Sequence, residues 1–334
     1  MIKKLALSIV ILTSSLLASN EVNVYSSRHY DTDKELFKTF EKKSGIKVKV
    51  IQAKDDALIK RMESEGANSP ADVFITVDAA RIERATQKGL FQAIESKLLT
   101  NVVPEKLRDK NNQWFAITKR ARIVAIKKGS SALETLETYE QLSDPKYKGQ
   151  IMVRSSSNVY NQSLMAGMIA HHGIEYATSW AKGVVANMAR DPKGSDRDQA
   201  KAVAAGIGSI AIMNTYYVGK LATSNESDKE VVSKVKVFFP KFENGGTHIN
   251  ISAAGVAKHA KNKENAIKFI EFLVSKEAQE VFANGNFEYP VIKNAKISPL
   301  VSSWGELKED NVSINDLGKY NKDAVKALDI AGWK

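Results

Sequence analysis

The chain has 334 residues, enough for one large or two medium-sized domains with hydrophobic cores of their own. It contains no cysteine, which excludes disulfide bonds, iron–sulfur clusters, thiolate metal sites and a lipid-modified cysteine anchor. Its 49 Lys and Arg residues outnumber its 38 Asp and Glu residues, giving a formal net charge of +11. The basic residues are scattered in short lysine pairs, which favours a solvated basic surface over a nucleic-acid-binding face.

The first residues have the pattern of a secretory signal peptide. Lys3 and Lys4 precede an apolar run over residues 5–17, and small polar residues follow that run. The run is shorter than the roughly 20 residues that a membrane span needs, which favours a cleaved signal over an uncleaved anchor. We therefore expect residues 1–19 to be removed. Because an exported chain without a lipid anchor needs an outer membrane to retain it, we expect the mature protein in the periplasm.

Beyond the signal, β-branched apolar runs alternate with segments of helical periodicity. This alternation is typical of an α/β fold with parallel sheets, and it occurs in both halves of the chain. The predicted strands are residues 21–26, 46–52, 72–77, 150–154, 209–214, 235–239 and 249–254, and the predicted helices are 34–43, 55–65, 81–88, 162–172, 199–205 and 265–283.

Tyrosines follow three of these predicted strands, each just before a helix. The first strand is followed by His29 and Tyr30, the fourth by Tyr160, and the fifth by the adjacent pair Tyr216 and Tyr217. The carboxyl ends of strands form the edge at which open α/β folds bind ligands. Packing or capping would explain one such aromatic residue as well as ligand binding does. Four of them at equivalent places indicate a possible site, although position alone leaves both interpretations open.

A cluster of phenols suits a hard trivalent cation. Fe³⁺ prefers oxygen donors, and although a free phenol has a pKa of about 10, such a cation favours the deprotonated form. Four phenolates around one Fe³⁺ would leave a charge of −1, so either one tyrosine stays protonated or a cation stands nearby. Arg120 and Arg122 are candidates for that cation, and surface salt bridges would explain them equally well.

The turn before the helix of Tyr160 carries three serines, Ser155 to Ser157, whose hydroxyls either bind an anion or simply cap the helix. His29 is the single histidine that we place at the metal. His171 and His172 lie at a predicted helix end, where capping explains them. The sequence contains no Gly-x-Ser-x-Gly, His-Glu-x-x-His or phosphate-binding glycine loop, so we do not expect an enzyme.

At these residues the sequence resembles the bacterial periplasmic ferric-ion-binding proteins, the receptors of iron ABC transporters in the type-II periplasmic binding protein superfamily. The resemblance extends over nearly the whole mature chain, and its strongest mark is the run that ends in Asn214, Thr215, Tyr216 and Tyr217. The segments that carry it are residues 24–30, 69–74, 145–149, 157–163, 211–217, 247–252 and 286–291.

The resemblance implies two α/β lobes that close on one ferric ion. Each lobe has a mainly parallel sheet flanked by helices, and crossing hinge strands join the lobes. We expect the first lobe to comprise residues 20–118 and 245–295, and the second to comprise residues 119–244 and 296–334. The protein would act as a monomer and deliver Fe(III) to an ABC-type permease of the inner membrane.

The resemblance also implies a set of ligands. In some relatives carbonate or phosphate completes the metal shell, and Arg120 matches the arginine that holds this anion better than Arg122 does. The alternative is a receptor for an inorganic anion or a small organic solute on the same scaffold, which would use the serines and arginines. The metal ligands implied here are Tyr160, Tyr216 and Tyr217 from the second lobe and His29 and Tyr30 from the first.

Overall fold

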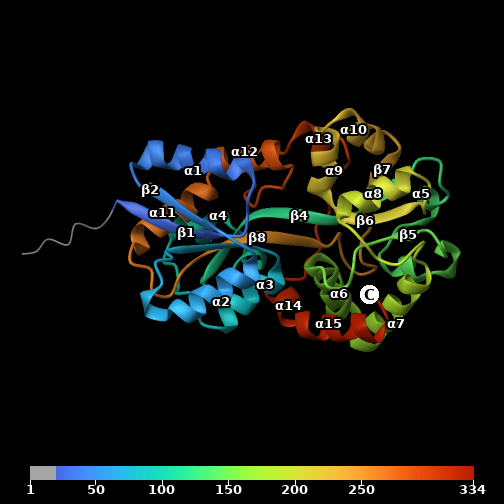
Figure 1. Ribbon diagram of the computed structural model, residues 1–334, viewed down its shortest axis with the longest axis horizontal. Helices are drawn as coiled ribbons and strands as arrows, with labels where there is room; N and C mark the ends of the chain where they lie inside the picture. Colours follow the sequence, from blue (N-terminus) through green and yellow to red (C-terminus); the bar gives the residue numbers. More distant parts are fainter. Residues whose placement is uncertain (1–19) are drawn as a thin grey trace, which may run out of the picture.

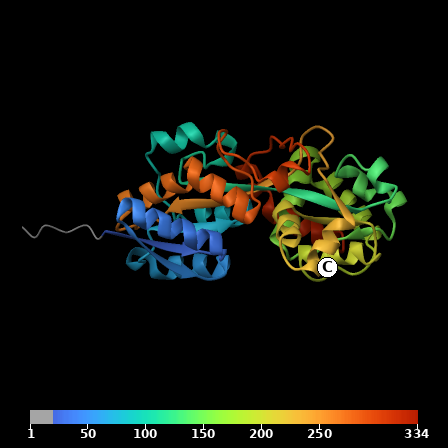
Figure 2. The same ribbon diagram turned by 90° about the horizontal axis from the view of Figure 1, so that it is seen from above.

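The computed structural model describes residues 20–334, and the predicted signal peptide lies outside the described residues. The elements form two halves that lie side by side (Figure 1 and Figure 2). One half carries β1 to β3 with α1 to α4, α11 and α12, and the other carries β5 to β7 with α5 to α10. Strands β4 and β8 run between the two halves.

The strands are β1 (Glu21–Ser26), β2 (Lys47–Gln52), β3 (Val73–Val77), β4 (Trp114–Lys127), β5 (Ile151–Met152), β6 (Ile210–Asn214), β7 (Val235–Phe238) and β8 (Ile249–Val256). The helices are α1 (Asp31–Ser44), α2 (Asp55–Glu65), α3 (Ala79–Gln87), α4 (Lys97–Val102), α5 (Ala132–Thr135), α6 (Val159–His172), α7 (Ile174–Ala186), α8 (Asp196–Ala204), α9 (Thr215–Ala222), α10 (Glu226–Ser233), α11 (Lys263–Leu273), α12 (Lys276–Asn286), α13 (Pro299–Ser302), α14 (Ile314–Lys319) and α15 (Asn321–Ile330). Short 3₁₀ turns are η1 (Gly66–Asn68), η2 (Glu105–Leu107), η3 (Glu140–Ser143) and η4 (Pro145–Tyr147).

The strands form one continuous path in the order β2-β1-β3-β8-β4-β6-β5, and β7 also pairs with β4. In the first half β1 is parallel to β2 and β3, and only β8 is reversed. In the second half β5 is parallel to β6, and β4 runs antiparallel to both β6 and β7. Each half therefore has one reversed strand among strands of a common direction. These two reversed strands, β4 and β8, pair with each other from Trp114–Gly255 to Ala121–Ile249 and so connect the halves.

Several elements differ from the sequence prediction, and helices α4, α7, α10, α14 and α15 were not predicted. The single helix expected over residues 265–283 is two helices, because α11 ends at Leu273 and α12 begins at Lys276. The Ser275 hydroxyl caps α12 by accepting a hydrogen bond from the Ala278 N–H at 3.3 Å. Strand β4 was not predicted. Its fourteen residues contain Lys119, Arg120 and Arg122, which interrupt the apolar pattern even though the strand is buried along almost its whole length.

The hydrophobic core extends through both halves. Fully buried side chains of β1, β3 and β8 pack against α1, α3 and α11 in the first half, and the same cluster continues into the second half through α6 and α7. A separate, smaller cluster around Ile123, Met152 and Met213 also lies in the second half. A third cluster packs Tyr216 against Phe287 and Tyr289, so the ring of this tyrosine is held by other aromatic side chains. Within residues 20–334, no helix is long and apolar enough to cross a membrane.

Candidate metal centre

A cavity of about 340 Å³ brings together residues from both halves. Its walls come from the turn between β1 and α1 in the first half and from the first turns of α6 and α9 in the second. The residues that line it are Ser27, Arg28, His29, Tyr30, Val77, Tyr160, Arg197, Tyr216, Tyr217 and Lys220. All five residues that were predicted as metal ligands are among them.

The second half contributes three phenols that converge from two helices. Tyr160 lies in the first turn of α6, where its N–H donates to the side chain of the N-cap residue Asn158 at 3.1 Å. Tyr216 and Tyr217 lie in the first turn of α9. The tyrosines thus belong to the helices rather than to the turns before them. The Tyr216 hydroxyl donates to the Tyr160 hydroxyl at 3.1 Å, and the rings of Tyr216 and Tyr217 are 4.2 Å apart.

The first half contributes His29 and Tyr30, which follow β1. Tyr30 occupies the N-cap position of α1, yet its side chain makes no capping hydrogen bond and instead lines the cavity. The two rings stack with centroids 5.2 Å apart. His29 is exposed and Tyr30 is half-buried, so the imidazole lies at the solvent side of the group.

The phenols influence one another electrostatically. Burial raises the pKa of Tyr216 well above its ordinary value, and the charges of Tyr160, Tyr30 and Tyr217 raise it further. Burial likewise raises the pKa of Tyr30, and it raises the pKa of Tyr217 to about 12. These three side chains therefore stay neutral near pH 7 unless a cation stabilises the phenolates. A metal ion bound by these oxygens would therefore have to displace their protons.

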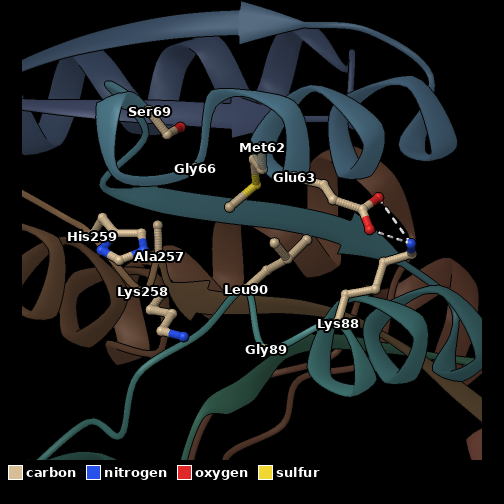
Figure 3. A pocket seen from close by; sticks show the side chains of 10 residues that line it. All are labelled: Met62, Glu63, Gly66, Ser69, Lys88, Gly89, Leu90, Ala257, Lys258 and His259. Atoms are coloured by element: carbon tan, nitrogen blue, oxygen red, sulfur yellow. Dashed lines mark hydrogen bonds and ion pairs between the residues drawn. The ribbon is translucent and has the colours of Figure 1, made fainter.

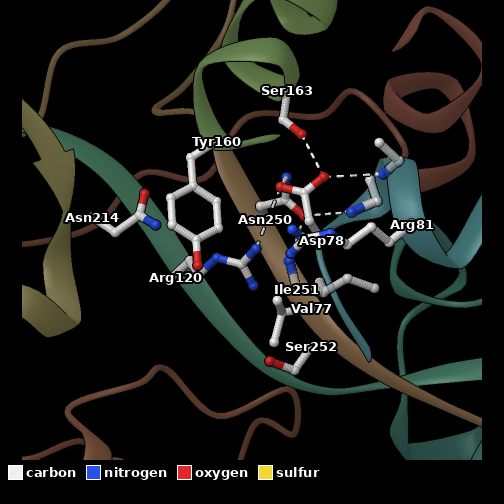
Figure 4. Close-up of polar contacts among 12 residues, drawn as sticks. Val77, Asp78, Arg81, Arg120, Tyr160, Ser163, Asn214, Asn250, Ile251 and Ser252 are labelled. Atoms are coloured by element: carbon white, nitrogen blue, oxygen red, sulfur yellow. Dashed lines mark hydrogen bonds and ion pairs between the residues drawn. The ribbon is translucent and has the colours of Figure 1, made fainter. Parts of the chain in front are cut away.

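Arg120 and Arg122 lie beside Tyr160, each only 2% exposed, so the interpretation of surface salt bridges was wrong for both. Their guanidinium carbons are 5.2 Å and 5.9 Å from the centre of the Tyr160 ring. Arg122 is tied to Asp196 at 2.6 Å and to two asparagines. Arg120 has a looser partner, Asp78, at 3.5 Å, and its positive charge lowers the pKa of Tyr216 (Figure 4). Arg120 is therefore the better candidate for a cation that acts on the phenols.

Three cations that line the cavity were missed in the sequence: Arg28, which is paired with Asp33 and Glu288, and the two residues Lys220 and Arg197. Lys220 is 5.4 Å from the centre of the Tyr30 ring and donates to the Gly285 carbonyl at 2.8 Å. The guanidinium carbon of Arg197 is 5.9 Å from the centre of the Tyr217 ring. Lys220 lies four residues after Tyr216 on α9, a spacing that places both on one helix face and could have revealed it. Arg197 comes from α8, and no local spacing connects it to the tyrosines.

The serines that were considered for anion binding do not line this cavity. The hydroxyls of Ser155 and Ser157 are 3.0 Å apart, and the Ser157 N–H donates to the Ser155 hydroxyl at 3.2 Å.

Another cavity, of about 180 Å³, lies in the first half between α2, α3 and the end of β8 (Figure 3). Its walls include the ion pair of Glu63 with Lys88 at 2.7 Å, and no predicted site residue lines it.

Comparisons with known proteins agree on one group. Residues 68–308 match the family model of the bacterial extracellular solute-binding proteins. Iron uptake protein A1 of Synechocystis sp. (strain ATCC 27184 / PCC 6803 / Kazusa) is 49% identical over 315 residues, which cover 94% of this chain and 88% of that protein. Major ferric iron-binding protein of Neisseria meningitidis serogroup A is 26% identical over 98% of each chain.

Solved structures give the same result. The Trichodesmium protein IdiA (FutA), solved in complex with iron and citrate ligands, is 50% identical, with a TM-score of 0.91 over 94% of this chain and 100% of that one. The ferric binding protein from Campylobacter jejuni is 44% identical, with a TM-score of 0.88 and the same coverage. These matches confirm the predicted two-lobed α/β fold and the predicted resemblance. The chain therefore belongs to the family of bacterial extracellular solute-binding proteins, which includes these iron uptake proteins.

Proposed function

We propose that the protein is a periplasmic receptor that binds one Fe³⁺ between its two halves and delivers it to an ABC-type permease of the inner membrane. The ligands are the phenolates of Tyr160, Tyr216 and Tyr217 from the second half and the side chains of His29 and Tyr30 from the first. The observation that carries this proposal is the 3.1 Å contact between the hydroxyls of Tyr216 and Tyr160, in a cavity that Tyr30 and Tyr217 also line. The relatives, which are named as iron uptake and ferric iron-binding proteins, support it.

The charges around the cavity favour this assignment. Three phenolates neutralise Fe³⁺, and a fourth leaves one negative charge. Lys220 and Arg197 line the cavity, and Arg120 lies beside Tyr160. These cations can balance the extra charge, so we infer that all four tyrosines bind as phenolates.

We infer that an anion completes the shell. Carbonate and phosphate were the predicted anions, and the solved Trichodesmium relative adds a tricarboxylate, since it contains iron and citrate. Arg197 and Lys220 offer a carboxylate two cationic partners inside the cavity. An anion held there would occupy the metal positions that protein side chains leave open.

The positions of the proposed metal ligands indicate that iron binding closes the two lobes. His29 and Tyr30 belong to the proposed first lobe, and the other three ligands belong to the second, so one ion bound by both holds the lobes together. Strands β4 and β8 form the hinge, because they are the strands that pair across both halves. Excluding water from the closed cavity strengthens every charge interaction in it. The protein acts as a monomeric receptor and not as an enzyme.

The test is the phenolate-to-iron absorption band in the visible spectrum of the mature protein loaded with ferric citrate. We expect this band in the wild type and a much weaker band in the double variant Tyr216→Phe/Tyr217→Phe, which keeps only two of the four phenols. Tyr320→Phe serves as the control, since Tyr320 lies between α14 and α15 and does not line the cavity. A band of wild-type intensity in the double variant would refute the site. Calorimetric titration with ferric citrate against phosphate and sulfate separates iron binding from the alternative of an anion receptor.

A further inference from the structure

A second group of ligand-type side chains lies away from the cavity, at the far end of α6. His171 and His172 were expected to do no more than cap this helix. The structure pairs each with a carboxylate: His171 Nε2 lies 3.1 Å from both side-chain oxygens of Asp310, and His172 Nε2 lies 2.7 Å from Glu140 Oε1. Twelve residues of α-helix separate His172 from Tyr160, which is about 18 Å along the axis. This second group is therefore independent of the proposed iron site.

Three elements meet at His172. Glu140 comes from the 3₁₀ turn η3, His172 from the last turn of α6, and Glu243 from the loop that follows β7. One ligand atom from each of these three side chains lies within 4.8 Å of the others. They range from buried Glu140 through half-buried His172 to exposed Glu243, so the group is open to solvent on the side of Glu243.

The buried carboxylate of Glu140 is only half satisfied. Glu140 is 4% exposed, and its Oε1 lies next to His172 and accepts from the Glu243 N–H at 3.3 Å. Its other oxygen, Oε2, is buried without a hydrogen-bond partner in the described part of the chain. A buried carboxylate oxygen left without a partner loses solvation free energy that a bound cation would restore.

We propose that Glu140, His172 and Glu243 bind a divalent transition-metal ion, with Zn²⁺ the best match. One imidazole nitrogen and two carboxylate oxygens are donors that Zn²⁺ accepts, and two carboxylates balance its charge. Three protein ligands leave a fourth tetrahedral position for water. Bonds of about 2.0–2.2 Å place tetrahedral ligand atoms about 3.4 Å apart. The exposed Glu243 needs to move inward, and the contact between His172 and Glu140 needs to lengthen slightly.

Binding here would fix the segment that leads into a hinge strand. Phe242, next to Glu243, stacks on His171 with ring centroids 4.3 Å apart and makes a tilted contact with Tyr139 at 4.8 Å. The Tyr139 hydroxyl accepts from the His248 N–H at 3.1 Å, directly before β8 begins. A metal that joins η3, α6 and this loop would therefore hold the entry to β8 in place.

Zinc titration can test the proposal. The mature protein, free of any affinity tag, would carry Tyr216→Phe/Tyr217→Phe so that phenolates of the cavity do not compete for the metal. Titration with Zn²⁺ should give about one equivalent of saturable binding. Glu243→Gln, which changes an exposed side chain and spares the fold, should weaken that binding at least about tenfold, and His172→Gln should do the same. His171→Gln, at the same helix end but paired with Asp310, should retain it.

Equal zinc affinity in the Glu243→Gln, His172→Gln and reference proteins would overturn the proposal, as would the absence of saturable binding. Diffraction from wild-type crystals grown with Zn²⁺, measured at the zinc absorption edge, gives a second readout. We expect an anomalous peak between the three side chains. A peak found only in the tyrosine cavity would contradict the proposed site, while leaving the proposed iron function intact.

Discussion

Protons compete with iron at the level of single side chains. The raised pKa values of Tyr30, Tyr216 and Tyr217 mean that each is a neutral phenol near pH 7 in the metal-free protein. Binding as a phenolate therefore releases a proton from each, and lowering the pH favours the metal-free form. We expect at least three protons released per Fe³⁺, one from each of these side chains, so that affinity falls by about a thousandfold or more per pH unit. Proton release can be measured by pH-stat titration, corrected for ferric citrate alone. Release of no protons would contradict phenolate ligation.

Lys220 offers a test of charge balance. It is half-buried, donates to a backbone carbonyl and lies near the Tyr30 ring. Removing its charge in Lys220→Gln leaves the extra phenolate charge less balanced. We expect iron binding to weaken by about 1 kcal/mol, roughly fivefold, because the site is partly open to solvent. Competition with a chelator at fixed pH and ionic strength measures the change. Lys241→Gln, an exposed lysine that does not line the cavity, should leave affinity unchanged.

At the scale of elements, Asp78 connects five of them. It ends β3 with a left-handed backbone (φ 87°), caps α3, and accepts from Ser163 of α6 at 2.7 Å and from Asn250 of β8 at 2.9 Å (Figure 4). It is also the carboxylate partner of Arg120 in β4. Asp78 therefore lies where the two halves meet. Its partner Ser163 lies three residues after Tyr160 on α6.

Removing this carboxylate leaves the buried Arg120 without its counter-charge. We expect Asp78→Ala to lower the free energy of unfolding by about 3 kcal/mol, measured by urea denaturation. Asp56→Ala removes an aspartate of similar chemistry from an exposed pair with Arg84, and should cost less than about 1 kcal/mol. If both variants unfolded at the same urea concentration, the buried node would have no special role in stability.

Local patterns predicted the bounds of β1 and α2 correctly, because their apolar spacing is uninterrupted. They failed for β4, where Arg120 and Arg122 are buried through partners that are distant in sequence. The tyrosine cluster was predictable, since strand ends in an α/β fold share an edge. Arg197 was not, because its contact with Tyr217 depends on how α8 packs beside α9.

The whole molecule explains why the site is divided. Three phenols reside on one half and His29 and Tyr30 on the other, while the paired strands β4 and β8 connect the two halves. A ligand that binds both halves stabilises the closed arrangement by its differential affinity for it. In the proposed mechanism, the second-half phenols form a partial site that binds iron before closure.

Removing the first-half ligands should therefore separate binding from closure. In His29→Ala/Tyr30→Phe we expect weakened iron binding with a visible band still present, because the phenolates of Tyr160, Tyr216 and Tyr217 remain. Small-angle X-ray scattering should show that ferric citrate reduces the radius of gyration of the wild type and leaves that of this variant nearly unchanged. Tyr320→Phe should contract like the wild type. Full contraction of the double variant would show that the second half drives closure alone, and that His29 and Tyr30 merely border the cavity.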